Sequence, residues 1–406
     1  MLSMAPFLGR LWFQRLSANC PGPFQDKTGV FKAGLAKGAI CTGFYLGTFS
    51  LSEALGITFE EIDRAGVVTL DRPSRLNALT REMFEALSKH YRSWAPAPHI
   101  YGVVMQSTHP TVFSSGGDIR LLHEWSEQGA LSAIREFYRA AYTHVWVLEK
   151  FIRPNVPLIN GLVLGGGVGI SLFGTHCVAG EGYRFGMPQT GIGFLPDIGG
   201  TYFLPRMLGR TGLYLALTGR LIGPAEAYRH RLVSHCIPAA HFGVIKDALS
   251  DNHPIDRLLD GLHRDPGEGE LVRHTPLIDR AFSAPSVEAI LERLESEPGE
   301  DKTFALETAA EMRKKSPTSL KIAFAQCQRG KSLGLFDALR LEFRLASHLI
   351  GTHDYREGIA VRVAGKGRTP AWQPASLEAV DDAAIERLFR AEAEGELELQ
   401  EVRPGL

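Results

Sequence analysis

Three consecutive glycines, Gly165 to Gly167, form the part of this 406-residue chain best suited to bring its backbone close to a ligand. They directly follow the apolar run 157–164 and precede a segment of small residues. Because glycine has no Cβ, such a turn can approach a bound molecule without steric cost. Free N–H groups at a helix start would then point at that molecule and hold a phosphate or stabilise an oxyanion. This turn alone leaves both chemistries open.

A second glycine-rich turn, Ser114-Ser115-Gly116-Gly117-Asp118, follows the predicted strand Val103–Gln106 after a few residues. Two turns can supply two converging N–H donors, as acyl transfer requires, each contributing roughly 3 to 4 kcal/mol when well placed. Neither turn is followed by the Lys-Ser/Thr pair of a phosphate-binding loop, and GGGVG does not match the dinucleotide fingerprint. The pair therefore favours acyl chemistry, and close packing between strand and helix is the purely structural alternative.

Two polar side chains, Gln189 and Asp197, lie shortly after the triple glycine in an apolar stretch. A carboxylate can accept a proton or attack a carbonyl, whereas an amide can only orient a water or a hydroxyl group. Asp197 is therefore the candidate base or nucleophile, and the neighbouring Phe, Leu and Ile residues predict a dry site that raises its pKa. The structural alternative is that Asp197 buttresses the turn at Gly199 and Gly200.

Four segments occur in the order and spacing of a known family: RPSRLNAL (72–79), SSGGD (114–118), NGLVLGGGVGIS (160–171) and FGMPQTGIGFLPDIGG (185–200). On these motifs the chain resembles the crotonase (enoyl-CoA hydratase/isomerase) superfamily over roughly residues 57–374. Within it the chain is most similar to the 3-hydroxyisobutyryl-CoA hydrolases, because Gly169 stands where hydratases carry a catalytic Glu and Asp197 where they carry a small residue. The segments SPTSLK (316–321) and HDYREGIA (353–360) are also of the hydrolase type.

The resemblance implies an α/β fold, a crotonase-like spiral of ββα units with a helical C-terminal region. It implies that the backbone N–H groups of Ser115 and Gly166 form an oxyanion hole, that Asp197 is the nucleophile or base, and that Gln189 positions water or the substrate hydroxyl. The implied substrate- and CoA-binding residues are Leu76, Asn77, Ala78, Leu79, Gly116, Gly117, Asp118, Gly165 and Gly167. The implied reaction is hydrolysis of 3-hydroxyisobutyryl-CoA to 3-hydroxyisobutyrate and CoA, in valine catabolism. Coenzyme A belongs to the substrate, so no separate cofactor is expected.

Two acids of the hydrolase pattern are replaced in this chain. Gln189 stands where the family carries a Glu, and Ala141 stands just before Tyr142, where the family carries an acid. These departures keep two alternatives open. One is a non-catalytic crotonase-fold protein, for example a mitochondrial ribosome component, and the other is an enoyl-CoA hydratase or isomerase with its base elsewhere.

Composition is consistent with this interpretation. The formal charge of −1 gives no basic surface of the kind that drives nucleic-acid binding. The five cysteines are scattered without a CxxC pair, and no histidine has a second metal ligand at a useful spacing, so neither a metal site nor a disulfide framework is expected. The resemblance implies a homo-oligomer with an acyl-CoA substrate.

The first 52 residues differ from the rest and contain one acid, Asp26, before Glu53. Their basic, apolar make-up is typical of a mitochondrial presequence, which predicts the matrix, or the cytoplasm if the chain is bacterial. Lys37 and several polar residues argue against a membrane span at 33–51. We expect an extension at 1–52, a crotonase core with the oxyanion hole at 53–260, a helical part at 261–376 and an acidic tail at 377–406.

Periodicity predicts the elements that must position the site. Runs 57–62 and 66–70 predict a hairpin, and 81–94 predicts an amphipathic helix. Buried strands are expected at 103–106 and 157–164, joined by a helix at 131–151, which indicates a parallel sheet with crossover helices.

Overall fold

A six-stranded sheet forms one half of the computed structural model, which describes residues 55–365, 367–390, 392 and 395–399. Its first two strands are antiparallel and the others are parallel. The strands, in spatial order, are β1 (Ile57–Ile62), β2 (Ala65–Leu70), β3 (Gly102–Ser107), β5 (Asn155–Ile159), β7 (Val178–Ala179) and β9 (His235–Cys236). The predicted hairpin is confirmed as β1 and β2. The predicted presequence lies outside the described residues.

A smaller parallel sheet carries the site. Its strands are β4 (Val112–Ser114), β6 (Leu162–Leu164) and β8 (Arg184–Gly186), in that order. Each strand ends just before one of the candidate segments, since the two glycine turns follow β4 and β6 and the Gln189 segment follows β8. Because the carboxyl ends of parallel strands meet at one edge of a sheet, this sheet gathers the three segments.

The predicted strand 157–164 is wrong as a single element. The structure divides it into β5 and β6, which belong to different sheets. The break falls at Asn160 and Gly161, where a Cβ on Gly161 would lie 2.4 Å from the backbone of Thr111. Only glycine permits that approach, so the chain leaves one sheet and enters the other there.

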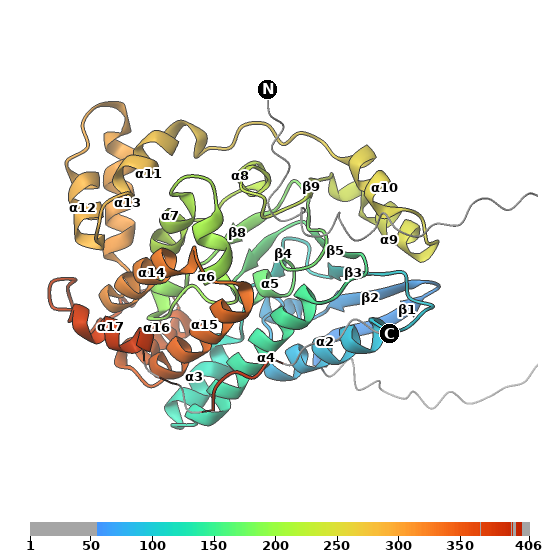
Figure 1. Ribbon diagram of the computed structural model, residues 1–406, viewed down its shortest axis with the longest axis horizontal. Coiled ribbons are helices and arrows are strands. Elements are labelled where there is room, and N and C mark those ends of the chain that lie inside the picture. The colour runs from blue at the N-terminus through green and yellow to red at the C-terminus, as the bar shows by residue number, and fades with distance from the viewer. Residues whose placement is uncertain (1–54, 366, 391, 393–394, 400–406) are drawn as a thin grey trace, which may run out of the picture. The chain divides into compact units, whose positions relative to one another are not determined.

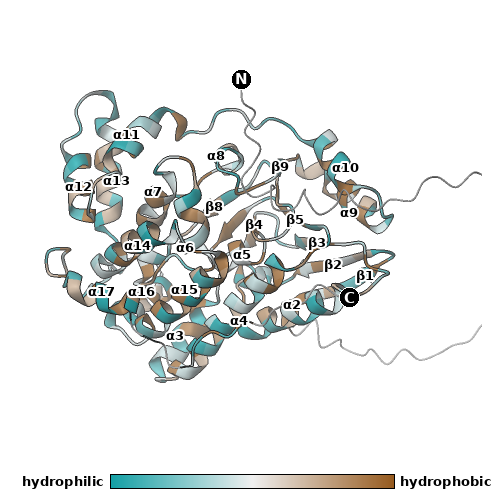
Figure 2. Cartoon of the chain, viewed as in Figure 1, coloured by the Kyte–Doolittle hydropathy of each residue, from teal (hydrophilic) through white to brown (hydrophobic). Residues whose placement is uncertain are grey.

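The sheets are covered by helices in the first two thirds of the chain. The helices are α2 (Arg81–Trp94), α3 (Ile119–Glu127), α4 (Leu131–Glu149), α5 (Gly166–Gly169), α6 (Gly200–Phe203), α7 (Thr211–Thr218), α8 (Pro224–Arg229), α9 (Phe242–Ser250) and α10 (Ile255–Leu262). Helix α2 begins at a Thr80 cap and buries Met83, Phe84, Leu87 and Tyr91 on one face. Figure 2 shows the matching alternation of hydrophilic and hydrophobic residues along the helices.

The C-terminal third is helical, as expected. It contains α11 (Thr275–Ala281), α12 (Val287–Glu295), α13 (Lys302–Arg313), α14 (Pro317–Gly330), α15 (Leu335–Leu349), α16 (His353–Ala364) and α17 (Asp382–Arg390). Figure 1 shows α15 and α16 beside the α3 and α4 helices, and contacts join α15 to α4 and α16 to α3. The C-terminal helices therefore reach the part of the core where the site lies.

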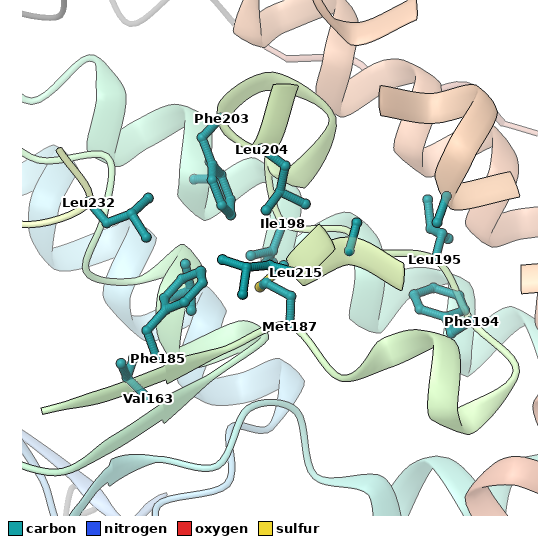
Figure 3. Close-up of a cluster of buried hydrophobic side chains, with 14 of the residues drawn as sticks. Val163, Phe185, Met187, Phe194, Leu195, Ile198, Phe203, Leu204, Leu215 and Leu232 are labelled. Atoms are coloured by element: carbon teal, nitrogen blue, oxygen red, sulfur yellow. The ribbon is translucent and has the colours of Figure 1, made fainter. Parts of the chain in front are cut away.

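One continuous apolar cluster runs through both parts, from Ile57 to Leu399. Figure 3 shows the portion around the site, where Met187, Ile198 and Leu204 lie among buried side chains from β6, β8 and α7. The boundary between residues 260 and 261 stays a prediction. No helix in the described part of the chain is both long enough and apolar enough to cross a bilayer.

Candidate active site

The two glycine turns meet. A Cβ built on Gly116 would lie 3.4 Å from the amide nitrogen of Gly166, and one built on Gly166 would lie 3.2 Å from the amide nitrogen of Gly117. Gly116 and Gly165 have φ angles of 96° and 41°, in the region that favours glycine. Side chains on these residues would crowd the two backbones, so the glycines are required by this close approach.

The amides at this meeting point differ in whether they are already bonded. The Ser115 amide donates to the Leu76 carbonyl oxygen at 3.0 Å, and the Gly116 amide donates to Ser114 Oγ at 3.2 Å. Within the described residues, the amides of Gly117 and Gly166 donate no hydrogen bond. The N–H group of Ser115, which was expected to serve as an oxyanion donor, is therefore already bonded within the chain, whereas those of Gly117 and Gly166 are not.

Asp197 lies between η2 (Gln189–Ile192), a 3₁₀ helix, and α6, and is 6% exposed. Its Oδ2 accepts a hydrogen bond from Tyr142 Oη at 2.8 Å, and its Oδ1 accepts one from Gln189 Nε2 at 3.0 Å. Burial raises the pKa of Asp197 to about 6, and the two hydrogen bonds oppose this rise. The predicted dry surroundings and raised pKa are thus present, and the carboxylate is ionised for the most part at neutral pH.

Gln189 joins this acid to the glycine turns. Its Nε2 donates to Asp197 and would lie 3.3 Å from a Cβ on Gly165. Only the amide nitrogen can donate to a carboxylate, which settles the orientation of the side chain. Its Oε1 therefore points elsewhere and is buried without a hydrogen-bond partner among the described residues. A buried acceptor of this kind is costly unless a ligand or a water satisfies it.

Position 169 has no room for a side chain. A Cβ on Gly169 would lie 2.7 Å from Cγ1 of Ile198, and the other two nearest atoms also belong to Ile198. Ile198 itself is buried and belongs to the apolar cluster around the site. The glutamate that hydratases carry at this position, according to the resemblance, therefore does not fit this packing.

Comparison with known proteins adds to this geometry. The family model described as enoyl-CoA hydratase/isomerase matches residues 65–389, which include the three-stranded sheet and every strand of the six-stranded sheet except β1. The chain belongs to the enoyl-CoA hydratase/isomerase family. As a member of this family it has the crotonase fold expected from its motifs.

Curated relatives in this family carry the hydrolase name. The chain is 35% identical over 353 residues to the mitochondrial 3-hydroxyisobutyryl-CoA hydrolase of Danio rerio, an alignment that covers 84% of this chain and 91% of the relative. It is 33% identical over 345 residues to the mitochondrial 3-hydroxyisobutyryl-CoA hydrolase of Homo sapiens, which covers 82% of this chain and 88% of the relative.

Solved structures in the same family match the fold. A carnitinyl-CoA dehydratase from Mycobacterium thermoresistibile has a TM-score of 0.80 and 27% identity, covering 85% of this chain and 99% of that chain. An enoyl-CoA hydratase from Rhodobacter sphaeroides has a TM-score of 0.76 and 32% identity, covering 82% and 97%.

The expected CoA-binding residues fall into two groups. Leu76 is 46% exposed, so its side chain is open to a ligand. Asn77 and Leu79 are fully buried, and Asn77 Nδ2 donates to Ser107 Oγ and to the Phe113 carbonyl oxygen. These two side chains hold the turn together, so only their backbone can face a nucleotide.

Asp118 and the remaining small residues also have structural partners. Asp118 caps α3 by accepting from the amides of Arg120 and Leu121, and its Oδ2 lies 3.1 Å from Arg72 Nη1. Arg72 Nη1 also donates to the Ala78 carbonyl oxygen. A Cβ on Gly167 would lie 2.8 Å from the Cβ of Ser114, so this glycine serves the packing of the two turns.

Sequence reasoning missed two side chains of the site. It considered Tyr142 only as the neighbour of Ala141, whereas its hydroxyl bonds Asp197. It did not consider Glu342 of α15, which is fully buried and accepts from the amides of Gly199 and Thr201, both at 2.8 Å. A signal for Glu342 existed, since an acid three residues after Leu339 falls on the apolar face of this helix.

Proposed function

We propose that this chain hydrolyses short hydroxyacyl-CoA thioesters, with 3-hydroxyisobutyryl-CoA as the substrate and 3-hydroxyisobutyrate and CoA as products. One observation carries the proposal: the buried Asp197 carboxylate is hydrogen-bonded to Gln189, which lies beside a glycine turn whose Gly166 amide donates no hydrogen bond within the described residues. The mitochondrial 3-hydroxyisobutyryl-CoA hydrolases among its relatives support the same substrate.

The amides of Gly117 and Gly166 bind the thioester carbonyl oxygen in this proposal. Negative charge develops on that oxygen as the acyl carbon becomes tetrahedral, so two preorganised N–H donors stabilise the transition state more than the ground state. Because the donors belong to the backbone, the surrounding side chains do not enter this step. This oxyanion hole requires only that residues 117 and 166 are glycines.

Asp197 supplies the second half of the reaction. Its carboxylate either attacks the acyl carbon, expelling the CoA thiolate and leaving an anhydride for water to cleave, or removes a proton from water as the water attacks. In both cases the acid must be ionised. A pKa of about 6 keeps it so at neutral pH while leaving it more basic than an exposed aspartate.

Gln189 positions other groups of the reaction and does not itself react. Its Nε2 holds Oδ1 of Asp197, which leaves Oε1 free to accept a hydrogen bond. The proposed donor to Oε1 is the attacking water or the hydroxyl group of the substrate. A substrate without this hydroxyl would leave a buried acceptor unsatisfied, which is a physical basis for selecting hydroxyacyl groups.

Release of free thiol from 3-hydroxyisobutyryl-CoA and 3-hydroxypropionyl-CoA tests the proposal, with Asp197→Asn measured alongside. We expect turnover by the wild-type protein and its loss in the variant, with the fold retained. Isobutyryl-CoA, which differs from 3-hydroxyisobutyryl-CoA only by the missing hydroxyl, serves as the matched substrate and is expected to react more slowly. A folded wild-type protein without thioesterase activity would contradict the proposal.

The non-catalytic alternative is not favoured, since the curated relatives carry enzyme names. Co-sedimentation of the chain with ribonucleoprotein particles, in place of a free oligomer, would support it. The matrix location, the homo-oligomer and the binding of the CoA nucleotide along Leu76–Leu79 belong to the proposal. Import into isolated mitochondria and measurement of molar mass in solution test the first two.

A further inference from the structure

Glu342 is a buried acid that approaches the site from the far end of the chain. It lies on α15, is fully buried, and uses both carboxyl oxygens. Oε2 accepts from the Gly199 amide and Oε1 accepts from the Thr201 amide, each at 2.8 Å. The Gly199 amide belongs to the turn that follows Asp197, and the Thr201 amide belongs to α6, which begins directly after that turn. A buried carboxylate is costly unless hydrogen-bonded, so this arrangement depends on the two amides.

The turn that Glu342 holds has an unfavourable backbone. Ile198 has a φ of 59° and Gly199 a φ of 85°, so two consecutive left-handed residues follow Asp197. A β-branched residue rarely adopts this conformation, and it persists only where surrounding contacts impose it. The Ile198 side chain is buried against Gly169. The turn is therefore held by its packing and by hydrogen bonds from other elements.

A second helix holds the same turn from its other end. Gln326 of α14 donates through Nε2 to the Pro196 carbonyl oxygen, immediately before Asp197, and to Thr201 Oγ1. Together, Gln326 and Glu342 bond the backbone on both sides of Asp197. In the part of the chain that the structure describes, the side-chain hydrogen bonds of Asp197 come from Tyr142 and Gln189, so Gln326 and Glu342 act on the backbone that carries the acid.

We propose that Glu342 is a positioning residue that, by holding the amides of Gly199 and Thr201, fixes the strained turn and thereby orients the Asp197 carboxylate toward the acyl carbon. The catalytic part of this inference rests on the proposed thioester hydrolysis. The structural part, that Glu342 determines the environment of Asp197, can be measured without turnover.

Electrostatic coupling between the two acids supports the proposal. Burial raises the pKa of Glu342 to about 8, and the charge of Asp197 adds to this rise. The tyrosines that face the pair are Tyr138 and Tyr142 from α4 and Tyr355 from α16, all with pKa values raised by burial. They stay neutral at pH 6 to 8, so Asp197 and Glu342 are the two acids of this cluster expected to change charge in that range.

The nearby cations on the same helices are engaged elsewhere. Arg344 of α15 donates to the Glu396 carboxylate, and Arg139 of α4 donates to the Glu396 carbonyl oxygen. The ion pairs of these two guanidinium groups in the described structure are with Glu136, for Arg139, and with Glu396, for Arg344. A change in titration on replacing Glu342 is therefore assigned to the coupling of the two acids.

Glu342→Gln tests the proposal, because the amide keeps one acceptor but presents a donor to the second amide. We expect kcat for 3-hydroxyisobutyryl-CoA to fall at least tenfold with KM changed less than twofold, since orientation affects the chemical step rather than binding. In protein labelled with ¹³C at aspartate carboxyls, we expect the Asp197 signal to show two inflections in the wild type. Glu342→Gln should leave a single inflection.

Glu226→Gln is the matched control. Glu226 is also buried and also accepts from two backbone amides, those of Gly223 and Leu271. The Glu226→Gln variant should lower the melting temperature as Glu342→Gln does, but it should leave kcat and both inflections of the Asp197 signal unchanged. An unchanged kcat in Glu342→Gln, or an equal loss in both variants, would overturn the positioning role. If the wild type has no thioesterase activity, the proposed function fails, and the carboxyl titration alone decides whether Glu342 governs Asp197.

Discussion

The two halves of the site are built in different ways. The half proposed to bind the carbonyl consists of backbone amides from the turns that follow β4 and β6, where glycines leave room for the two backbones to approach each other. The acidic half is the single side chain of Asp197 on an irregular segment, which bonds Tyr142 and Gln189 directly and is held by α14 and α15 through the backbone. The turns of the first half therefore follow from local sequence, whereas the backbone that carries Asp197 depends on residues more than a hundred positions away.

Asp197→Asn should produce the largest effect, because it removes the carboxylate that accepts the hydrogen bond from Gln189. We expect kcat to fall at least a thousandfold in the thiol-release assay, since an amide is neither base nor nucleophile. The fold should be kept. Tyr142 can still donate to the new amide oxygen, and the unpartnered Gln189 Oε1 can rotate to accept from the new amide nitrogen.

The same variant should gain stability at neutral pH. The folded pKa of Asp197 lies above its unfolded value, so the folded state binds the proton more tightly and loses stability as pH rises from about 4 to 6. A rise from 3.8 to about 6 corresponds to about 3 kcal/mol of unfolding free energy at pH 7, which the neutral amide avoids. Urea unfolding at pH 7 measures this difference, and a variant less stable than the wild type would contradict it.

Gly166→Ala changes the glycine turns and should cause the next largest loss of activity. The new methyl group would lie 3.2 Å from the amide nitrogen of Gly117 and 3.3 Å from Phe84 Cζ, so it would separate the two donors. Loss of one well-placed donor lowers kcat roughly a hundredfold to a thousandfold. Gly243→Ala is the control, since a Cβ there meets nothing within 4 Å. Equal rates for both alanine variants would show that the glycine turns do not bind the carbonyl.

The division between local and distant determinants explains which features the sequence predicts well. The β1–β2 hairpin, helix α4 and both glycine turns follow from residues that are adjacent in the chain. The choice between the amides of Ser115 and Gly117 does not, because it depends on a bond from Ser115 to the Leu76 carbonyl oxygen, 39 positions earlier. A shift of one residue in a turn reverses which N–H group is free.

The division of segment 157–164 and the role of Glu342 are not predictable from the sequence for the same reason. The segment 157–164 has the pattern of one apolar strand. Its division at Gly161 depends on the close approach of the Thr111 backbone, which the local sequence does not indicate. Glu342 lies 145 positions after Asp197, and only the docking of α15 brings them together. Periodicity shows that an acid falls on an apolar face, but it does not say which backbone groups satisfy that acid.

Gln189→Glu adds a second acid beside Asp197 and should raise the activity. The two side chains are 3.0 Å apart, so two carboxyl groups there would share a proton, and the pair would titrate at a higher pH. We expect turnover to rise and its acid limb to move to higher pH, because the second carboxylate can act as a base where the amide cannot. The pH profile of kcat measures both changes. An unchanged or lower rate at every pH would mean that the pocket is adapted to the amide.

Tyr142→Phe should have the smallest effect, because it changes the basicity of Asp197 without removing it. The Tyr142 hydroxyl donates to Oδ2 at 2.8 Å and so lowers the pKa of Asp197 against the rise caused by burial. Without this bond the pKa rises above 6, and the acid limb of the kcat profile moves to higher pH while the rate above that limb changes only a few-fold. Tyr91→Phe is a matched control, since its buried hydroxyl bonds Asn155 instead. If Tyr142→Phe leaves the acid limb in place, that limb does not report on Asp197, and the acidic half of the site must be assigned to another group.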